Sequence, residues 1–287
     1  MQTMKAELVV DAHARLGEGP IWDARTGELL WVDIMAGLVH RYHPASGADR
    51  IFDVGQPVGT VVPRAAGGYA FAVRDGFAVG DENGITVVAG VNVGRDGIRM
   101  NDGACDSAGR FWAGSMHVED RAGAGALYRL DTDGEAVTVL PTVTISNGIG
   151  WSLDERTMYY IDTHAWSVDT LDFDPETGAA TNRRKLIVID PKDGAPDGLV
   201  VDAEGCIWVA LWEGWGVRRY APDGTLLMTV EVPVARVTKP AFGGHDLDEL
   251  YLTTASPPDP DDAQPHAGGL FCVRPGVRGL PVNAFAG

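Results

Sequence analysis

The 287-residue chain has few cysteines, few positive charges and no long apolar run. Its three cysteines, Cys105, Cys206 and Cys272, lie far apart without a CxxC pair, which indicates reduced structural thiols and argues against a disulfide framework or a zinc site. No apolar run approaches the roughly 18 residues that a membrane-spanning helix needs. Residues 1–19 lack the sustained apolar core of a secretory signal, so we expect a cytoplasmic protein.

Positive charge is scarce relative to negative charge. The chain has 23 Lys and Arg against 40 Asp and Glu, a formal net charge of −17 at pH 7. Because such a chain repels polyanions, nucleic acids and anionic membrane surfaces are not expected as partners. We expect a small-molecule ligand, and a monomer or a small homo-oligomer.

Several common catalytic signatures are missing from the sequence. There is no GxSxG, which argues against a serine hydrolase of that type, and no HExxH or P-loop pattern. The glycines of residues 121–128, RAGAGALY, lack the third glycine and the strand–helix setting of a dinucleotide-binding loop. We therefore interpret this stretch as a turn.

What the sequence does have is an internal repeat. Similar segments, such as NGIGWSLDERTMYYID and PDGLVVDAEGCIWVAL, each contain a short apolar run, a turn rich in Asp and Gly, and a second apolar run. They recur at intervals of 41 to 50 residues, and one residue in each marks the same phase. These six anchor positions are Glu18, Gly59, Asn101, Asn147, Asp197 and Lys239.

The repeat predicts an all-β fold, a six-bladed β-propeller with four-stranded antiparallel blades around a central channel. Alternating Val, Ile, Trp and Tyr favour strands, and long helical periodicity is absent. An eight-stranded sandwich would leave the repeat unexplained. We expect one domain, residues 1–287, with the segment AELVVDA (residues 6–12) pairing into the last blade to close the ring.

In a propeller the anchor positions come together at one end of the channel, because the innermost strand of every blade lines it. Glu18, Asn147 and Asp197 would then offer two carboxylates and an amide oxygen, a set that suits hard divalent cations. An alternative remains open, because Asn-Gly and Asp-Gly are also common turn dipeptides. The shared phase of these residues favours a site.

The motifs RLGEGPIWD, RMNDGACDSAGRFWAGSM, ISNGIGWSLDERTMYYIDT, APDGLVVDAEGCIWVALWEG and VTKPAFGG occur in this order along nearly the whole chain. In this combination the sequence resembles the regucalcin (senescence marker protein)–gluconolactonase–luciferin-regenerating enzyme family. The resemblance implies a six-bladed propeller with one divalent cation, Ca²⁺, Zn²⁺, Mg²⁺, Mn²⁺ or Fe²⁺, in the channel. It also implies hydrolysis of sugar lactones such as gluconolactone or xylonolactone.

The resemblance further implies roles for individual residues. The metal ligands would be Glu18, Asn147 and Asp197, and Asp197 would also serve as the catalytic base. The substrate-binding residues would be Arg99, Asn101 and Glu119. Three alternatives stay open at this point: a hydrolase of non-sugar lactones or phosphotriesters, a non-catalytic calcium-binding regulatory protein, and a protein-binding propeller.

Overall fold

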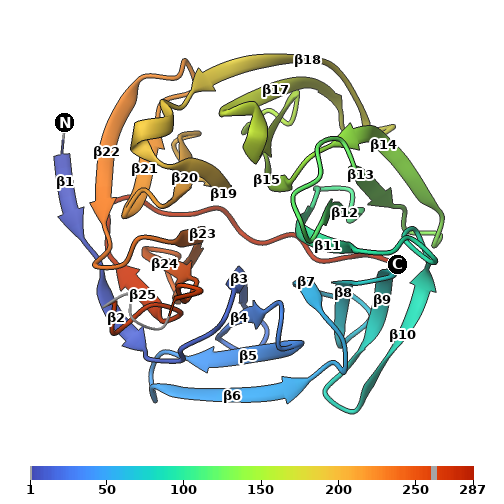
Figure 1. Ribbon diagram of the computed structural model, residues 1–287, viewed down its shortest axis with the longest axis horizontal. Coiled ribbons are helices and arrows are strands. Elements are labelled where there is room, and N and C mark those ends of the chain that lie inside the picture. The colour runs from blue at the N-terminus through green and yellow to red at the C-terminus, as the bar shows by residue number, and fades with distance from the viewer. Residues whose placement is uncertain (1, 260–263) are drawn as a thin grey trace.

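Six sheets, each built on antiparallel blade strands, stand around a central channel (Figure 1), as the repeat predicts. The computed structural model describes residues 2–259 and 264–287. The first three blades are built from β3 (Gly17–Asp23), β4 (Glu28–Asp33), β5 (Leu38–His43) and β6 (Ala48–Asp53); β7 (Val58–Pro63), β8 (Tyr69–Val73), β9 (Gly76–Asp81) and β10 (Gly84–Ala89); and β11 (Ile98–Cys105), β12 (Phe111–His117), β13 (Gly125–Leu130) and β14 (Ala136–Val143).

The last three blades follow in the same way. They are built from β15 (Ser146–Trp151), β16 (Thr157–Asp162), β17 (Ser167–Asp174) and β18 (Ala179–Val188); β19 (Ala195–Val201), β20 (Ile207–Trp212), β21 (Gly216–Tyr220) and β22 (Leu226–Glu231); and β23 (Val237–Gly243), β24 (Glu249–Thr254) and β25 (Leu270–Val273). In the described part of the chain the helices are two three-residue turns, η1 (Thr163–Ala165) and η2 (Pro191–Asp193), and no helix is long and apolar enough to cross a membrane.

The N-terminal segment closes the ring, as predicted from the sequence. Strand β2 (Glu7–Val10) pairs with β25 and supplies the fourth strand of blade six. Strand β1 (Gln2–Lys5) adds to blade five, parallel to β22. Blade six therefore combines an N-terminal strand with three later ones, and its innermost strand β23 lies beside β3 of blade one.

The innermost strand of each blade lies beside the innermost strands of its two neighbours. The order around the channel is β3, β7, β11, β15, β19 and β23, and β23 lies beside β3 again. Blade three therefore lies opposite blade six. Glu18 and Asn147 likewise belong to opposite blades, one and four.

A repeated carboxylate–tryptophan contact fixes the turn between the first two strands of two blades. The Asp106 carboxylate accepts hydrogen bonds from two turn amides and, at 2.8 Å, from the indole N–H of Trp112. Asp202 does the same with Trp208, at 2.9 Å. Both segments read D-x-x-G-x-x-W in the sequence. The pattern places each tryptophan in the layer between blades and gives its N–H a partner.

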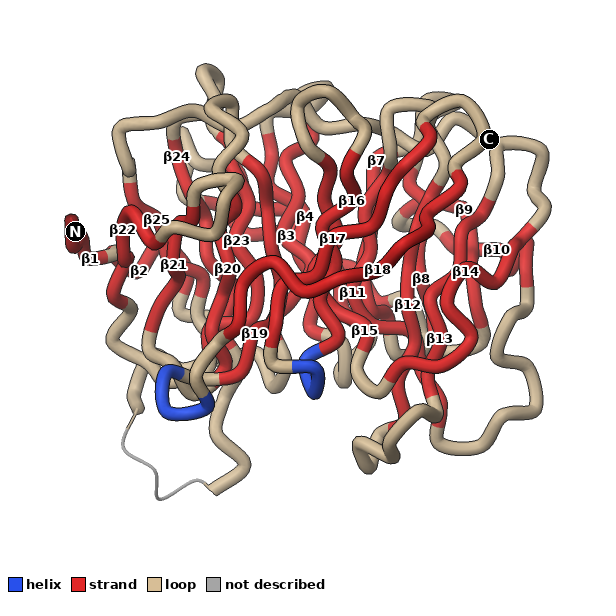
Figure 2. Tube along the Cα trace, turned by 90° about the horizontal axis from the view of Figure 1, so that it is seen from above, coloured by secondary structure: helices blue, strands red, loops and turns tan. Residues whose placement is uncertain are grey.

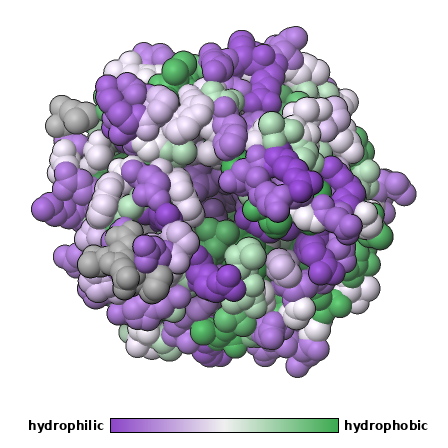
Figure 3. All heavy atoms as spheres, viewed as in Figure 1, coloured by the Kyte–Doolittle hydropathy of each residue, from purple (hydrophilic) through white to green (hydrophobic). Residues whose placement is uncertain are grey.

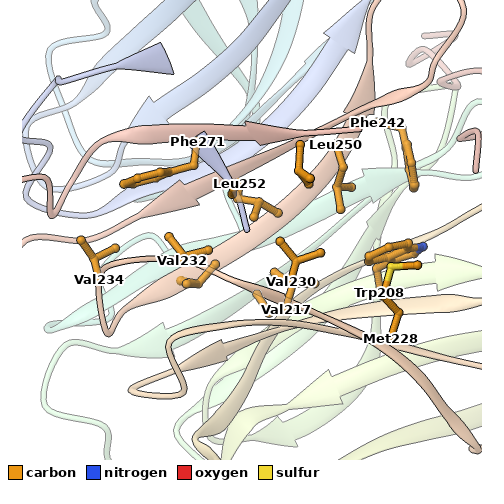
Figure 4. Packing of buried hydrophobic residues seen from close by; sticks show 14 of the residues in the cluster. Trp208, Val217, Met228, Val230, Val232, Val234, Phe242, Leu250, Leu252 and Phe271 are labelled. Atoms are coloured by element: carbon orange, nitrogen blue, oxygen red, sulfur yellow. The ribbon is translucent and has the colours of Figure 1, made fainter. Parts of the chain in front are cut away.

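Apolar side chains between adjacent blades form the core. Between blades five and six, Val217 and Val230 on one sheet face Leu250, Leu252 and neighbours on the other (Figure 4), and all four are fully buried. Similar clusters lie between the other blades. The blades therefore pack face to face around the channel, which fixes the positions of the inner strands.

The C-terminal segment, residues 274–287, crosses one end of the channel (Figure 1). It bonds first to blade five, where Ala203 N–H donates to Arg278 O. It then bonds to blade two, where Phe285 N–H donates to Pro63 O, and to blade three, where Ala286 N–H donates to Gly109 O. The turn η1 lies at the opposite side of the molecule from the C-terminus (Figure 2). This segment therefore covers one end of the channel.

Gly59 on β7 lies where the inner strands β7 and β11 approach each other closely. A Cβ at Gly59 would lie 2.3 Å from the carbonyl oxygen of Asn101 on β11. We expect Gly59→Ala to lower the melting temperature by about 3–10 °C, since overpacking typically costs about 1–3 kcal/mol. Differential scanning calorimetry measures the change.

The matched control is Gly90→Ala. A Cβ at Gly90 would meet only the exposed side chain of Val93, so this variant should melt within about 2 °C of the native chain. Equal melting temperatures for the two variants would contradict close packing of β7 against β11.

Candidate functional site

Each innermost strand changes its register with the next strand at or directly beside its anchor position. The shifts fall at Glu18/Ile21, Val58/Thr60, Met100/Gly103, Ser146/Ile149, Pro196/Leu199 and Val237/Lys239. Such an irregularity leaves a residue out of the ladder and turns its side chain away from the regular alternation. The repeat in the sequence therefore marks a repeated irregularity in the strands that line the channel.

A cavity of about 830 Å³ opens at the end of the channel that carries η1. Its lining includes four of the anchor residues, Glu18, Asn101, Asn147 and Asp197, together with Arg99. The face that carries residues 256–259 is hollowed near its centre, with hydrophilic and hydrophobic residues at the rim (Figure 3). A second cavity, of about 400 Å³, is lined in part by residues 280–283 of the C-terminal segment and has mainly apolar walls.

Two carboxylates and one amide of the first cavity are buried. Glu18 and Asn147 are each 4% exposed, and Asp197 is 5% exposed. The described residues contain no group of three or more His, Cys, Asp or Glu arranged to hold a metal. The candidate ligand set is thus two carboxylates with an amide oxygen, all hard oxygen donors.

Hydrogen bonds orient the Asn147 carboxamide. Its Nδ2 donates to Thr163 Oγ1 at 2.9 Å, and that hydroxyl donates to Pro196 O at 2.9 Å. Its Oδ1 accepts from Asn101 Nδ2 at 3.2 Å. A carbonyl oxygen has two lone pairs, so Oδ1 keeps one for a ligand in the cavity.

The Asp197 carboxylate is buried without a hydrogen-bond or ion-pair partner among the described residues. The Glu18 carboxylate accepts one hydrogen bond, from Gly19 N–H at 2.9 Å. Buried carboxylates are normally paired or bound to a metal, because an unpaired buried charge is strongly unfavourable. The donor types and the unpaired state of Asp197 therefore fit a divalent cation held by Glu18, Asn147 and Asp197.

Burial and like charge change the pKa values of the two carboxyls. Burial, followed by the neighbouring Asp102, raises the pKa of Glu18 to about 8. Burial, followed by the charges of Glu18 and Asp102, raises the pKa of Asp197 well above its ordinary value. Lys239 and Arg99 act in the opposite direction on both groups. Without a cation, the folded chain therefore favours protonated carboxyls at this site.

Arg99 supplies positive charge and N–H donors to the cavity wall. Its guanidinium donates to Asn101 Oδ1 at 2.6 Å and to Met100 O at 3.0 Å. Burial lowers the pKa of Arg99 to about 10, although Glu18, Asp120 and Asp197 raise it. The group is therefore a cation at neutral pH, and it holds Asn101 in place beside Asn147.

The structure does not bring Glu119 to the cavity. Its side chain is 66% exposed and pairs with Arg121 at 2.7 Å, and it does not line the cavity. Asp120, the next residue, lines the cavity and has a left-handed backbone with φ 52°. The two side chains of this loop point differently because the loop turns here, where Asp120 N–H donates to His117 O at 2.9 Å.

Sequence reasoning missed other residues at the cavity rim. The missed positions are Arg15, Thr163, His164, Trp166, Arg236 and Ser256. Most lie at strand ends or in loops, outside the repeated motif. The repeat therefore did not predict them. Thr163 and His164 directly follow β16, so the predicted end of that strand is the one signal that could have indicated these two.

The fold and the cavity together define a propeller with a polar site at the open end of its channel. The sequence matches the SMP-30/Gluconolactonase/LRE-like family over residues 16–256. It is 40% identical to regucalcin of Gallus gallus over the full length of both chains. The chain therefore belongs to this family, as the motifs indicate.

Solved structures resemble the whole molecule as well. A calcium-binding protein, regucalcin, from Agrobacterium tumefaciens is 29% identical, with a TM-score of 0.94 and coverage of 99% of each chain. Luciferin-regenerating enzyme is also 29% identical, with a TM-score of 0.90, covering 98% of this chain and 99% of its own. Family membership supports a lactonase or a calcium-binding propeller.

The raised pKa of Glu18 predicts how the metal-free chain responds to pH. An unfolded Glu titrates near 4.5, and the folded group titrates at about 8. Between these values the folded chain binds more protons, so this group's contribution to stability falls as pH rises. In EDTA at pH 8.5, Glu18→Gln should raise the melting temperature by at least about 2–4 °C, the effect of roughly 1 kcal/mol, and the gain should vanish near pH 5.

Glu18→Gln also distinguishes the cost of burying the Glu18 charge from the loss of a metal ligand. Added divalent cation should raise the melting temperature of the native chain and leave that of Glu18→Gln unchanged. A variant that is less stable than the native chain in EDTA at both pH values would contradict an unfavourable buried charge at Glu18.

Proposed function

We propose that this protein is a divalent-metal-dependent hydrolase that opens sugar (aldono-) lactones, such as gluconolactone or xylonolactone, to the aldonic acids. The observation that carries the proposal is the buried pair of carboxylates, Glu18 and Asp197, beside Asn147 in one cavity, with Asp197 unpaired. A cation bound there, Ca²⁺, Zn²⁺, Mg²⁺, Mn²⁺ or Fe²⁺, would polarise the lactone carbonyl and make a nearby water more acidic.

The cavity walls fit a small hydroxylated substrate. The cavity of about 830 Å³ has the size of typical small-molecule sites. Arg99 offers guanidinium N–H groups, and Asn101 lies beside it in the same wall. In this proposal these two residues bind and orient the lactone oxygens, and positioning of this kind can lower a barrier by several kcal/mol.

Asp197 is the proposed catalytic base. Its carboxylate lines the cavity beside Glu18 and Asn147, so that, when ionised, it can accept a proton from a water in the cavity. The water oxygen bonds to the lactone carbonyl carbon, and its proton passes to an Asp197 carboxylate oxygen. The ring C–O bond then breaks, and the leaving alkoxide takes that proton from Asp197, which yields the hydroxy acid and restores the carboxylate. Coordination of a cation by the same carboxylate would weaken it as a base, so metal and base roles compete at this residue.

A calcium-binding role without turnover is the second candidate. The regucalcin structure from Agrobacterium tumefaciens, 29% identical to this chain, is described as a calcium-binding protein. The same three oxygen ligands suit Ca²⁺. A tight, Ca²⁺-selective site in a protein that hydrolyses no lactone would support this role over the hydrolase.

A pH-indicator assay tests the proposed reaction. EDTA-stripped protein is mixed with glucono-1,5-lactone or a pentonolactone, and each divalent cation is restored in turn. We expect metal-restored proton release above the spontaneous rate, and Asp197→Asn should reduce it about 100-fold or more, because general base catalysis typically contributes that much.

The control for this assay is Asp223→Asn, which neutralises an exposed turn carboxylate that does not line the cavity. It should retain the native rate. Spontaneous rates with all five cations and with both lactones would overturn the sugar lactonase proposal.

The loop after β12 provides a test of substrate binding at Glu119 and Asp120. Because Asp120 lines the cavity and Glu119 pairs with Arg121 outside it, Asp120→Asn should raise KM about tenfold, the loss of one hydrogen bond to a charged group. Glu119→Gln should change KM less than about twofold. The reverse ranking of the two KM values would assign substrate binding to Glu119, as the family motif implies.

A further inference from the structure

A lysine–aspartate pair crosses the channel from one blade to the opposite blade. Lys239 on β23 of blade six donates from Nζ to Asp102 Oδ1 on β11 of blade three. Nζ also donates to Gly103 O at 3.2 Å, and Asp102 Oδ1 accepts from Gly103 N–H at 2.6 Å. Both side chains are buried. Since these blades lie opposite each other, the pair spans the width of the channel.

This cross-channel pair, Asp102 with Lys239, lies between the two cavities. Lys239 and Gly103 line the second cavity, while Asn101, the neighbour of Asp102, lines the first. The stem of Lys239 runs directly over Gly198, where an added Cβ would lie 2.5 Å from Lys239 Cβ and Cγ. Gly198 follows Asp197, so the lysine passes immediately beside one of the candidate metal ligands.

The pair contributes to the net charge around the candidate cation site. Glu18, Asp102 and Asp197 are three buried carboxyl groups, and Arg99 and Lys239 are two buried cations. Fully ionised, the five leave one excess negative charge. The second oxygen of Asp102, Oδ2, is buried with no hydrogen-bond partner among the described residues. The protein around the pair therefore leaves one acceptor of Asp102 unused.

We propose that the Asp102–Lys239 pair, which lies between the two cavities, sets the affinity of the first cavity for a divalent cation. The lysine holds positive charge beside Asp197 and thereby weakens cation binding, and Asp102 offsets that charge. The two residues are positioning residues, since neither lines the first cavity. This inference rests on the proposed metal site at Glu18, Asn147 and Asp197.

Opposite effects of the two single substitutions test the inference. Asp102→Asn leaves the lysine charge uncompensated, so the dissociation constant should rise about tenfold or more. Lys239→Met removes the positive charge, so the dissociation constant should fall. The double variant Asp102→Asn with Lys239→Met restores the native excess charge and should bind close to the native affinity.

The measurement is calorimetric titration of EDTA-stripped protein at pH 8 with Ca²⁺, Mn²⁺ and Zn²⁺, each alone. Circular dichroism and melting curves confirm that each variant is folded. Glu18→Gln serves as the control that loses the site. Where Lys239→Met does not fold because Asp102 is then buried unpaired, tighter binding by the double variant than by Asp102→Asn alone still supports the inference.

The outcomes separate the inference from the proposed function. In one outcome the native chain binds a cation, both single substitutions weaken binding by the same factor, and the double variant does not recover it. The pair would then have a purely structural role, which would overturn this inference alone. No cation binding by the native chain would overturn the metal site of the proposed function and, with it, this inference.

Discussion

Closure of the ring between blades six and one is the constraint on which the candidate site depends. Thr238 on β23 donates from Oγ1 to Gly17 O on β3 at 2.6 Å, although 221 residues separate the two along the chain. Gly17 precedes Glu18, and Thr238 precedes Lys239. The contact that closes the ring therefore also places the first candidate ligand beside the cross-channel lysine. Without closure, Glu18 would have no fixed position relative to Asp197.

The site concentrates charge that the fold does not neutralise. Three carboxyl groups meet in a buried space, and the pKa values of Glu18 and Asp197 rise as a result. Elsewhere in the described chain, buried carboxylates such as Asp106 and Asp202 accept hydrogen bonds from arginine and tryptophan side chains. The contrast is informative, because a protein gains stability by pairing its buried charges. An unpaired Asp197 is unfavourable for folding and favourable for binding a cation.

The sequence predicts those features that repeat. Glu18, Asn147 and Asp197 could be placed in one ring because the blades impose a common phase, and the structure puts all three in one cavity. Loop positions follow no such rule: Glu119 and Asp120 are adjacent in sequence, and only the turn of the backbone decides which faces the cavity. The partner of Lys239 could not be read from the sequence either, because it depends on how far a side chain reaches across the channel. The C-terminal segment lies outside the repeat altogether.

The six anchor residues occupy equivalent backbone positions in their blades, but their side chains differ in charge and size. These differences determine which chemical groups the site contains. Six identical carboxylates would repel one another and could not be buried together. Here Gly59 contributes no side chain, because β11 approaches too closely for one. Lys239 turns across the channel to the opposite blade, and Asn101 hydrogen-bonds Asn147. Among the six anchors only Glu18 and Asp197 contribute carboxyl groups, and both line the cavity together with Asn147. A symmetric frame thus yields an asymmetric set of side chains, with two carboxyl groups and one amide oxygen that reach one cavity from three blades.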